Sequence, residues 1–114
     1  MKYRGSCHCG KVTIEVEGEI KGAVSCNCSI CSKRGSLLAF FTRDQMKLSG
    51  ESELTTYTFN KHVIKHRFCK HCGVLPFGEG TDPKGVATVA VNIRCLDDFE
   101  FEKVPVQHYN GRAV

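Results

Sequence analysis

The chain has 114 residues, of which 41% are hydrophobic and 25% charged, and its formal net charge is +4. This length and composition predict one globular domain spanning residues 1–114, and no apolar run is long enough to cross a membrane. Lys and Arg are scattered among acidic residues without a basic stripe, so the charge favours a solvated surface over a nucleic-acid-binding face.

The amino-terminal segment contains no apolar stretch that could act as a signal peptide, and it already carries Cys7 and Cys9. Closely spaced thiols that are not in disulfides are typical of a reducing compartment. We therefore expect a cytoplasmic protein.

The sequence predicts a mainly β fold of antiparallel sheets, because helical periodicity is weak and short β-branched runs recur between turns. In residues 12–17, apolar and polar side chains alternate, which is typical of a half-buried strand ending at Gly18. Residues 79–85 contain Gly and Pro and are expected to form a loop that could border a site. Residues 101–109 contain Pro105, which places them at a sheet edge. Further strands are expected at residues 37–42, 47–49, 54–59, 63–68 and 86–93, the last of them central.

Seven of the eight cysteines fall into three short groups, and Cys95 stands apart. Cysteines this close in sequence cannot easily pair with each other in disulfides, whereas their thiolates can converge on one metal ion at ~2.3 Å. The grouping therefore predicts metal ligands. The three groups are Cys7 and Cys9; Cys26, Cys28 and Cys31; and Cys69 and Cys72.

The first and third groups are predicted to share one zinc ion. Each is followed by a glycine, Gly10 or Gly73, which tolerates the strained backbone of a turn that aims two sulfurs inward. Four thiolates would complete a closed tetrahedral site of the structural type, on which folding depends. The alternatives are that these cysteines are buried small hydrophobic residues or an isolated redox pair.

The middle group of Cys26, Cys28 and Cys31 offers three thiolates, and no fourth cysteine or histidine lies near it in sequence. Three protein ligands and one open position are typical of catalytic zinc. Alternatively, Cys95 or a histidine approaches in space and closes a second structural site. Cys95 itself is interpreted as a buried free thiol.

Beyond the cysteines, longer segments form one pattern, which runs through residues 5–10, 26–31, 68–73, 91–94, 96–98 and 105–108. This pattern resembles the glutathione-dependent formaldehyde-activating enzyme family over most of the chain. The chain departs from the family in being shorter than the named enzyme, in lacking a tryptophan near its end and in carrying Cys95. The resemblance implies a β-tent fold of twisted antiparallel sheets with two zinc ions. It implies structural zinc on Cys7, Cys9, Cys69 and Cys72, and catalytic zinc on Cys26, Cys28 and Cys31.

The activity implied by the resemblance is that of a carbon–sulfur lyase, which joins formaldehyde to the thiol of glutathione to give S-hydroxymethylglutathione. Three thiolates on zinc leave a position where a fourth thiol binds as its thiolate, so we expect the substrate sulfur to be activated there. The expected partner is a small-molecule thiol such as glutathione, and not a membrane. The alternatives are a non-catalytic zinc module that binds glutathione, protein or nucleic acid, and cysteine redox chemistry.

Four side chains outside the cysteine groups have two possible roles. Lys33 and Arg34 could steer the carboxylates of glutathione, but they are interpreted as solvated charges. His62 and His66 have the spacing of a helical zinc pair, but their neighbours predict a strand, in which that spacing spans ~13 Å. We interpret both as surface or sheet histidines.

Overall fold

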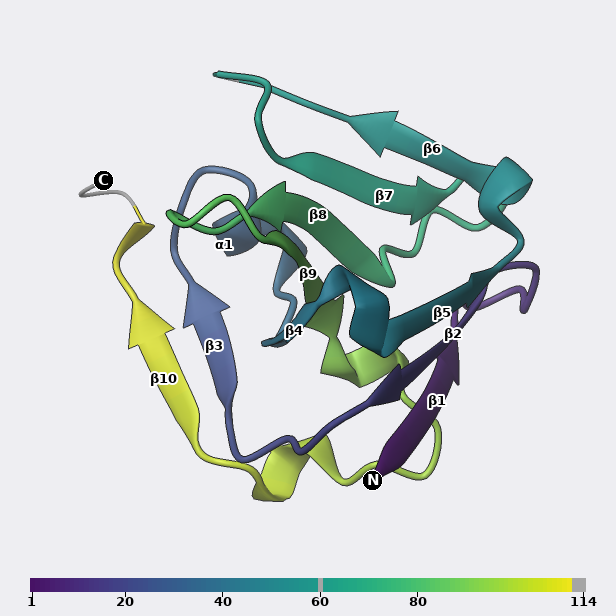
Figure 1. Ribbon diagram of the computed structural model, residues 1–114, viewed down its shortest axis with the longest axis horizontal. Helices are drawn as coiled ribbons and strands as arrows, with labels where there is room; N and C mark the ends of the chain where they lie inside the picture. Colours follow the sequence, from purple (N-terminus) through teal and green to yellow (C-terminus); the bar gives the residue numbers. More distant parts are fainter. Residues whose placement is uncertain (60, 112–114) are drawn as a thin grey trace.

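Two β-sheets enclose the hydrophobic core in the computed structural model, which describes residues 1–59 and 61–111 (Figure 1). The three-stranded sheet consists, in spatial order, of β1 (Lys2–Ser6), β2 (Thr13–Glu17) and β5 (Met46–Ser49). The seven-stranded sheet consists, in spatial order, of β10 (Val106–Tyr109), β3 (Ala23–Cys26), β4 (Leu38–Thr42), β9 (Ala87–Asn92), β8 (Phe77–Thr81), β7 (Lys65–Cys69) and β6 (Leu54–Tyr57). The predicted mainly β fold is confirmed.

Strand pairing confirms two predicted positions and adds one parallel pair that the sequence did not indicate. β9 lies in the middle of the seven-stranded sheet, and β10 lies at its edge directly after Pro105. All pairings between the described strands are antiparallel except that of β10 with β3, which is parallel (Figure 1). The predicted antiparallel sheets are confirmed, and this one edge pair is parallel. A parallel pair requires a long connection, here most of the chain, and so it leaves no local signal in the sequence.

Three described strands, β1, β3 and β8, are absent from the prediction because they are short or carry glycines that resemble turn residues. Glu79 to Thr81 complete β8, so the predicted loop at residues 79–85 is confined to its second half. Residues 101–109 divide into a 3₁₀ turn and β10. The short helical elements are α1 (Cys31–Arg34), η1 (Arg43–Gln45), η2 (Glu51–Glu53), η3 (Ile93–Cys95) and η4 (Phe101–Lys103). Within the described residues, no helix has the length and apolar character that a membrane crossing requires.

The core lies between the two sheets, because alternate side chains of each strand point toward the other sheet. In β4, Ala39 and Phe41 are buried, and in β9 Val89 and Val91 are fully buried. Val16 of β2 meets them from the three-stranded sheet. Complete burial of a side chain of the size of Val or Phe stabilises the fold by ~1.5–3 kcal/mol, so this layer fixes the orientation of the seven-stranded sheet.

The other face of the seven-stranded sheet carries a row of neighbouring residues from five strands. The register places Phe40 of β4, Ala90 of β9, Gly78 of β8, His66 of β7 and Tyr57 of β6 side by side. Because side chains alternate along each strand, this row faces away from the core. The two smallest residues, Gly78 and Ala90, lie in the middle of the row and leave a hollow there.

Candidate metal centres and the adjoining groove

The first and third cysteine groups meet in space. The Sγ atoms of Cys7, Cys9, Cys69 and Cys72 all lie within 4.8 Å of one another. Cys9 Sγ is 3.6 Å from the Sγ atoms of both Cys7 and Cys69. Four sulfurs placed ~2.3 Å from the centre of a tetrahedron are roughly 3.8 Å apart, so this donor set fits a zinc ion. All eight cysteines, which lie within the described ranges, are free of disulfides.

The backbone around these cysteines has the geometry that the glycines predict. Gly10 has φ 82° and Gly73 has φ 80°, both in the left-handed region that favours glycine. The backbone N–H of His71 points at the sulfur of Cys69, with 3.4 Å between the nitrogen and Sγ. Such N–H donors stabilise a thiolate, which is the form that binds metal.

The four-cysteine group also joins the two sheets. Cys7 follows β1 of the three-stranded sheet and Cys69 ends β7 of the seven-stranded sheet, and both are buried against Val12 in a small second core. A hydrogen bond from the backbone N–H of Val74 lowers the pKa of the Cys72 thiol to about 6. A four-thiol set at a junction of two sheets, with two of its cysteines buried, has the composition of a structural zinc site.

The middle group forms a second cluster, in which the Sγ atoms of Cys26, Cys28 and Cys31 also lie within 4.8 Å of one another. Cys26 ends β3 and Cys31 begins α1, so the turn between these elements gathers the three thiols. Among the described residues, no fourth cysteine, histidine or carboxylate joins them at this distance. Cys95 lies elsewhere, since its thiol donates to the carbonyl oxygen of Leu75 at 3.6 Å. A tetrahedral ion held by these three thiols would keep one position free.

The surroundings of the middle group are compatible with bound metal. Burial raises the pKa of the Cys28 thiol, but hydrogen bonds from the backbone N–H and thiol of Cys31 outweigh it, so the pKa is lowered. Burial, and after it the neighbouring Cys28 thiolate, raise the pKa of Cys31 to about 12. A second thiol beside a thiolate ordinarily loses its proton less readily. Gly111 packs against the group from the segment after β10. A Cβ atom at this position would lie 2.6 Å from Cys26 Sγ, so the position requires glycine.

The middle group opens into a groove of about 620 Å³ that runs over the outer face of the seven-stranded sheet. Gly78 and Ala90 form its floor, and Phe40, Phe59 and Ile64 form apolar walls. This volume is typical of small-molecule sites, which span about 300–1,000 Å³. The groove is therefore the candidate site for a substrate.

Arg34 lies in this groove and is not a solvated charge, which corrects the interpretation from sequence. Its Nη1 atom is 3.2 Å from Nδ1 of His66, and burial lowers its pKa. Lys33, its neighbour on α1, is exposed as predicted.

His66 belongs to β7 as predicted, but it is only 8% exposed, and its ring stacks on that of Phe59 with 5.5 Å between the centroids. His62 lies outside β7, with its Nδ1 2.8 Å from the hydroxyl of Thr58.

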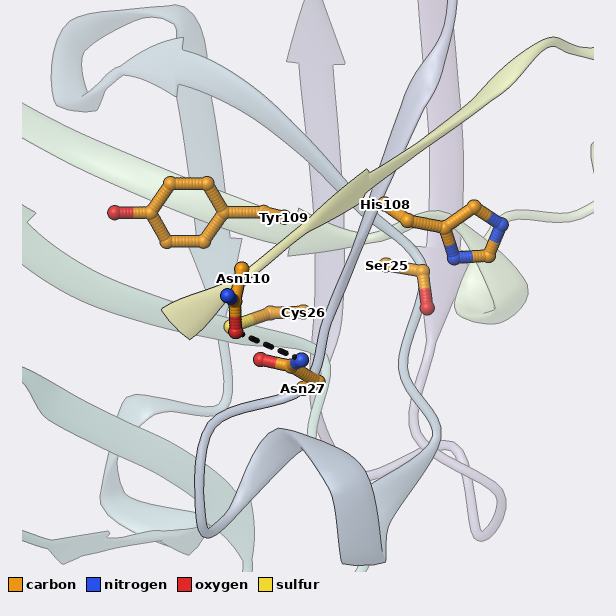
Figure 2. A pocket seen from close by; sticks show the side chains of 6 residues that line it. All are labelled: Ser25, Cys26, Asn27, His108, Tyr109 and Asn110. Carbon is orange, nitrogen blue, oxygen red and sulfur yellow. Dashed lines mark hydrogen bonds between the residues drawn. The ribbon is translucent and has the colours of Figure 1, made fainter. Parts of the chain in front are cut away.

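A smaller cavity of about 190 Å³ lies beside the middle group, between β3 and β10 (Figure 2). Figure 2 shows His108 and Ser25 on one side of β10 and the ring of Tyr109 directed to the other side. The side-chain amide of Asn27 donates to Oδ1 of Asn110 at 3.0 Å. This hydrogen bond ties the segments that follow β3 and β10 together beside Cys26, which lines the cavity.

A solved structure, a curated protein and a family model are similar to this chain. A crystal structure of a Rhodobacter sphaeroides protein is similar to this chain with a TM-score of 0.78 and 31% sequence identity, over 91% of this chain and 99% of the other. A Colletotrichum graminicola protein that carries the name of a glutathione-dependent formaldehyde-activating enzyme is 30% identical over 96 residues. That match covers 76% of this chain and 50% of the relative, so the chain spans about half the length of the curated relative. The family model for the glutathione-dependent formaldehyde-activating enzyme matches residues 2–111, and the chain therefore belongs to this family.

Proposed function

We propose that this chain is a zinc-dependent enzyme of the carbon–sulfur lyase type, which adds a small thiol to an aldehyde. Glutathione and formaldehyde are the substrates that the family's name indicates. In this proposal residues 1–114 act as one domain in the cytoplasm, where thiols stay reduced. Two zinc ions take part, one structural and one catalytic. The structural ion is held by Cys7, Cys9, Cys69 and Cys72, and the catalytic ion by Cys26, Cys28 and Cys31.

One observation carries the proposal: a three-thiol group, without a fourth protein ligand among the described residues, opens into a substrate-sized groove. A closed four-thiol set has no position for a substrate, whereas a three-thiol set does. The same chain carries both kinds of thiol set, which supports the proposal of one stabilising and one chemical role.

Zinc held by three thiolates supplies a place where a substrate thiol binds as its thiolate. The protein contributes the rest of the reaction environment. The cysteine turn between β3 and α1 fixes where the substrate sulfur lies, which lowers the entropic cost of bringing sulfur and aldehyde together. The apolar walls of the groove exclude water and so strengthen the electrostatic interactions within it.

Arg34 provides the positive charge that this reaction needs. Addition of a thiolate to an aldehyde moves negative charge onto the aldehyde oxygen, and a fixed guanidinium nearby stabilises that charge. Arg34 lies three residues after Cys31 and lines the groove. Its guanidinium contacts Nδ1 of His66, which also lines the groove, and this contact fixes the orientation of the guanidinium. His66 thus acts as a positioning residue for Arg34.

The proposal is tested by the rate at which S-hydroxymethylglutathione forms, measured by exchange nuclear magnetic resonance at equilibrium and corrected for the spontaneous reaction. The zinc-loaded wild type is expected to raise this rate, and Cys28→Ser is expected to abolish the increase. Cys95→Ser is the matched control, because it removes a thiol that belongs to neither group, and it should behave as the wild type.

Binding is followed separately in cobalt-substituted protein, because a new sulfur ligand changes the visible charge-transfer bands. Glutathione should shift the spectrum of the wild type but not that of Cys28→Ser. A shift without any rate increase would leave a glutathione-binding module in place of an enzyme. If neither effect occurs, the glutathione assignment is wrong.

A further inference from the structure

The groove changes in character with distance from the cysteines. Ser36, Leu38 and Phe40 follow one another with a period of two along the segment that becomes β4, and all three line the groove. At a rise of ~3.3 Å per residue, Ser36 and Phe40 are roughly 13 Å apart if this segment is extended. Ser36 and Arg34 form a polar end next to α1, whereas Leu38 and Phe40 form an apolar stretch beyond it.

The polar end contains a group that lacks a partner. Ser36 is 6% exposed, and its hydroxyl has no hydrogen-bond partner among the described residues. A buried hydroxyl without a partner costs about 1–3 kcal/mol, so its presence at the edge of a groove indicates a ligand atom that accepts a hydrogen bond there. An aldehyde oxygen is such an acceptor.

The apolar stretch is open and wide. Phe40 is 56% exposed and Ile64 is 55% exposed, although both are large hydrophobic residues that line the groove. Between them the floor is formed by Gly78, which has no side chain, and Ala90, which has only a methyl group, so the space above them is unfilled. Exposed apolar walls around a hollow floor are typical of a surface that binds an apolar group.

The charged side chains along this stretch already have partners within the protein. Glu79 lies 2.8 Å from Nη1 of Arg67 and 3.4 Å from Nε of Arg43. Asp82 accepts two hydrogen bonds, from the backbone N–H groups of Lys84 and Val86. Two arginines balance the charge of Glu79, and backbone N–H groups already occupy a carboxylate oxygen of Asp82, so this stretch offers no unpartnered cation and is complementary to an uncharged occupant.

We infer that the aldehyde substrate carries an extended, uncharged apolar group, which lies along Leu38, Phe40 and Ala90 while its oxygen accepts a hydrogen bond from Ser36. This inference rests on the proposed thiol–aldehyde addition. In that step the sulfur forms a bond to the aldehyde carbon, the π bond of the carbonyl breaks, and the thiol proton ends on the oxygen to give a thiohemiacetal. No oxidant or reductant is needed. Formaldehyde has no carbon chain and leaves the apolar walls unused.

The experiment compares formaldehyde, butanal and hexanal as partners of glutathione with the zinc-loaded protein. Rates are measured above the spontaneous reaction by exchange nuclear magnetic resonance. Full burial of one methylene favours binding by roughly fourfold, so kcat/KM is expected to rise between about fourfold and about 16-fold from butanal to hexanal. Binding without reaction is measured from the shifts of the Gly78 and Ala90 amide signals on addition of 1-hexanol, with ethanol as the short-chain comparison.

Gly78→Leu fills the floor of the groove. A Cβ atom at this position would lie 3.6 Å from the carbonyl oxygen of Lys65, an ordinary contact distance, so the backbone accepts a side chain there. The variant should remove the preference for hexanal over butanal. Gly80, two residues further along β8, also lines the groove, so Gly80→Leu should do the same. Thr13→Leu adds the same side chain at an exposed position of the three-stranded sheet and should preserve the preference. Ser36→Ala should slow the reactions of all three aldehydes together.

Faster reaction of formaldehyde without a preference for hexanal would overturn the substrate class and leave the proposed function intact. A preference that persists in both glycine variants would show that the chain binds elsewhere and would also overturn it. Failure with all three aldehydes would overturn the proposed function itself, whatever 1-hexanol does to the amide signals.

Discussion

Nη1 of Arg34 lies 3.2 Å from Nδ1 of His66, at the point where α1 faces β7 across the groove. Because a guanidinium does not lose its proton in proteins, it is the donor and Nδ1 is the acceptor. The imidazole is therefore neutral, with its proton on Nε2. The guanidinium of Arg34 is thus a cation whose orientation is set by the neutral imidazole of His66.

Replacement of Arg34 by glutamine should reduce the rate of thiohemiacetal formation on the order of 10²-fold, because a donor aimed at developing negative charge is lost. The stability of the fold should change little, since α1 contributes no buried residue to the core. Rates from exchange spectroscopy and thermal unfolding curves check the two statements. Lys33→Gln removes the exposed neighbouring charge and should leave the rate unchanged. Equal effects of the two variants would contradict a specific role for Arg34.

The pKa of His66 is lowered from its ordinary value of 6.5, first by burial and then by the charge of Arg34. The unfolded chain therefore binds a proton as the pH falls through 6.5 while the folded protein still does not. The contribution of this ring to stability is complete above pH 6.5 and is lost on acidification toward the lowered pKa, at no more than about 1.4 kcal/mol per pH unit. Nuclear magnetic resonance titration of the ring measures this pKa, and Arg34→Gln should raise it. A wild-type value of 6.5 or above would contradict the expected direction.

Purified protein should contain two zinc ions per chain, because the cysteines divide into a four-thiol and a three-thiol group. Elemental analysis of protein kept in buffer with zinc measures this ratio. The three-thiol group should exchange its ion with a chelator first, since it holds the ion through fewer protein bonds. A ratio near one under these conditions would rule out the two-site arrangement.

The two groups should differ in their effect on folding. Cys69→Ser removes a buried ligand where the sheets join, and a structural zinc contributes on the order of 10 kcal/mol, which is comparable with the whole stability of a small domain. This variant should unfold or aggregate. Cys28→Ser should keep its circular dichroism spectrum and most of its thermal stability. Similar losses in both variants would contradict the division into structural and catalytic sites.

Gly111→Ala should weaken zinc binding at the middle group alone. The added methyl would lie 2.6 Å from Cys26 Sγ and 2.9 Å from the Cβ atom of Cys28, so the thiols must shift. Zinc content should fall from two toward one per chain while the protein remains folded. Gly78→Ala adds a methyl with an ordinary contact distance of 3.6 Å and should keep both ions.

The sequence predicted the parts of the site that are encoded by short spacing. Two cysteine pairs could be assigned to one metal centre, because each pair and the glycine that follows it define a turn on their own. These pairs are Cys7 with Cys9, and Cys69 with Cys72. The strand at Thr13–Glu17 was visible for a similar reason, since its alternation with a period of two occurs within five residues.

The groove was not predictable in this way, because it depends on residues that meet only through the sheet. Arg34 is half-buried because β7 faces it, and nothing near it in sequence indicates this contact. Ser36 resembles any loop serine until its burial is known. One signal was present in residues 37–41, where five apolar residues follow one another. Such a run indicates a strand that is apolar on both faces. The face of this strand that points away from the core is then expected to contact another apolar group.

The parallel pairing of β10 with β3 also determines the order in which the site is made during synthesis. The ribosome releases the chain from its amino terminus at about 5–20 residues per second, so Cys26, Cys28 and Cys31 emerge several seconds before β10. During that interval the strand that flanks Cys26 is missing, and Gly111 has not yet covered its sulfur. The three thiols are thus open to metal ions before the groove exists, and β10 completes the wall around them only when it emerges later.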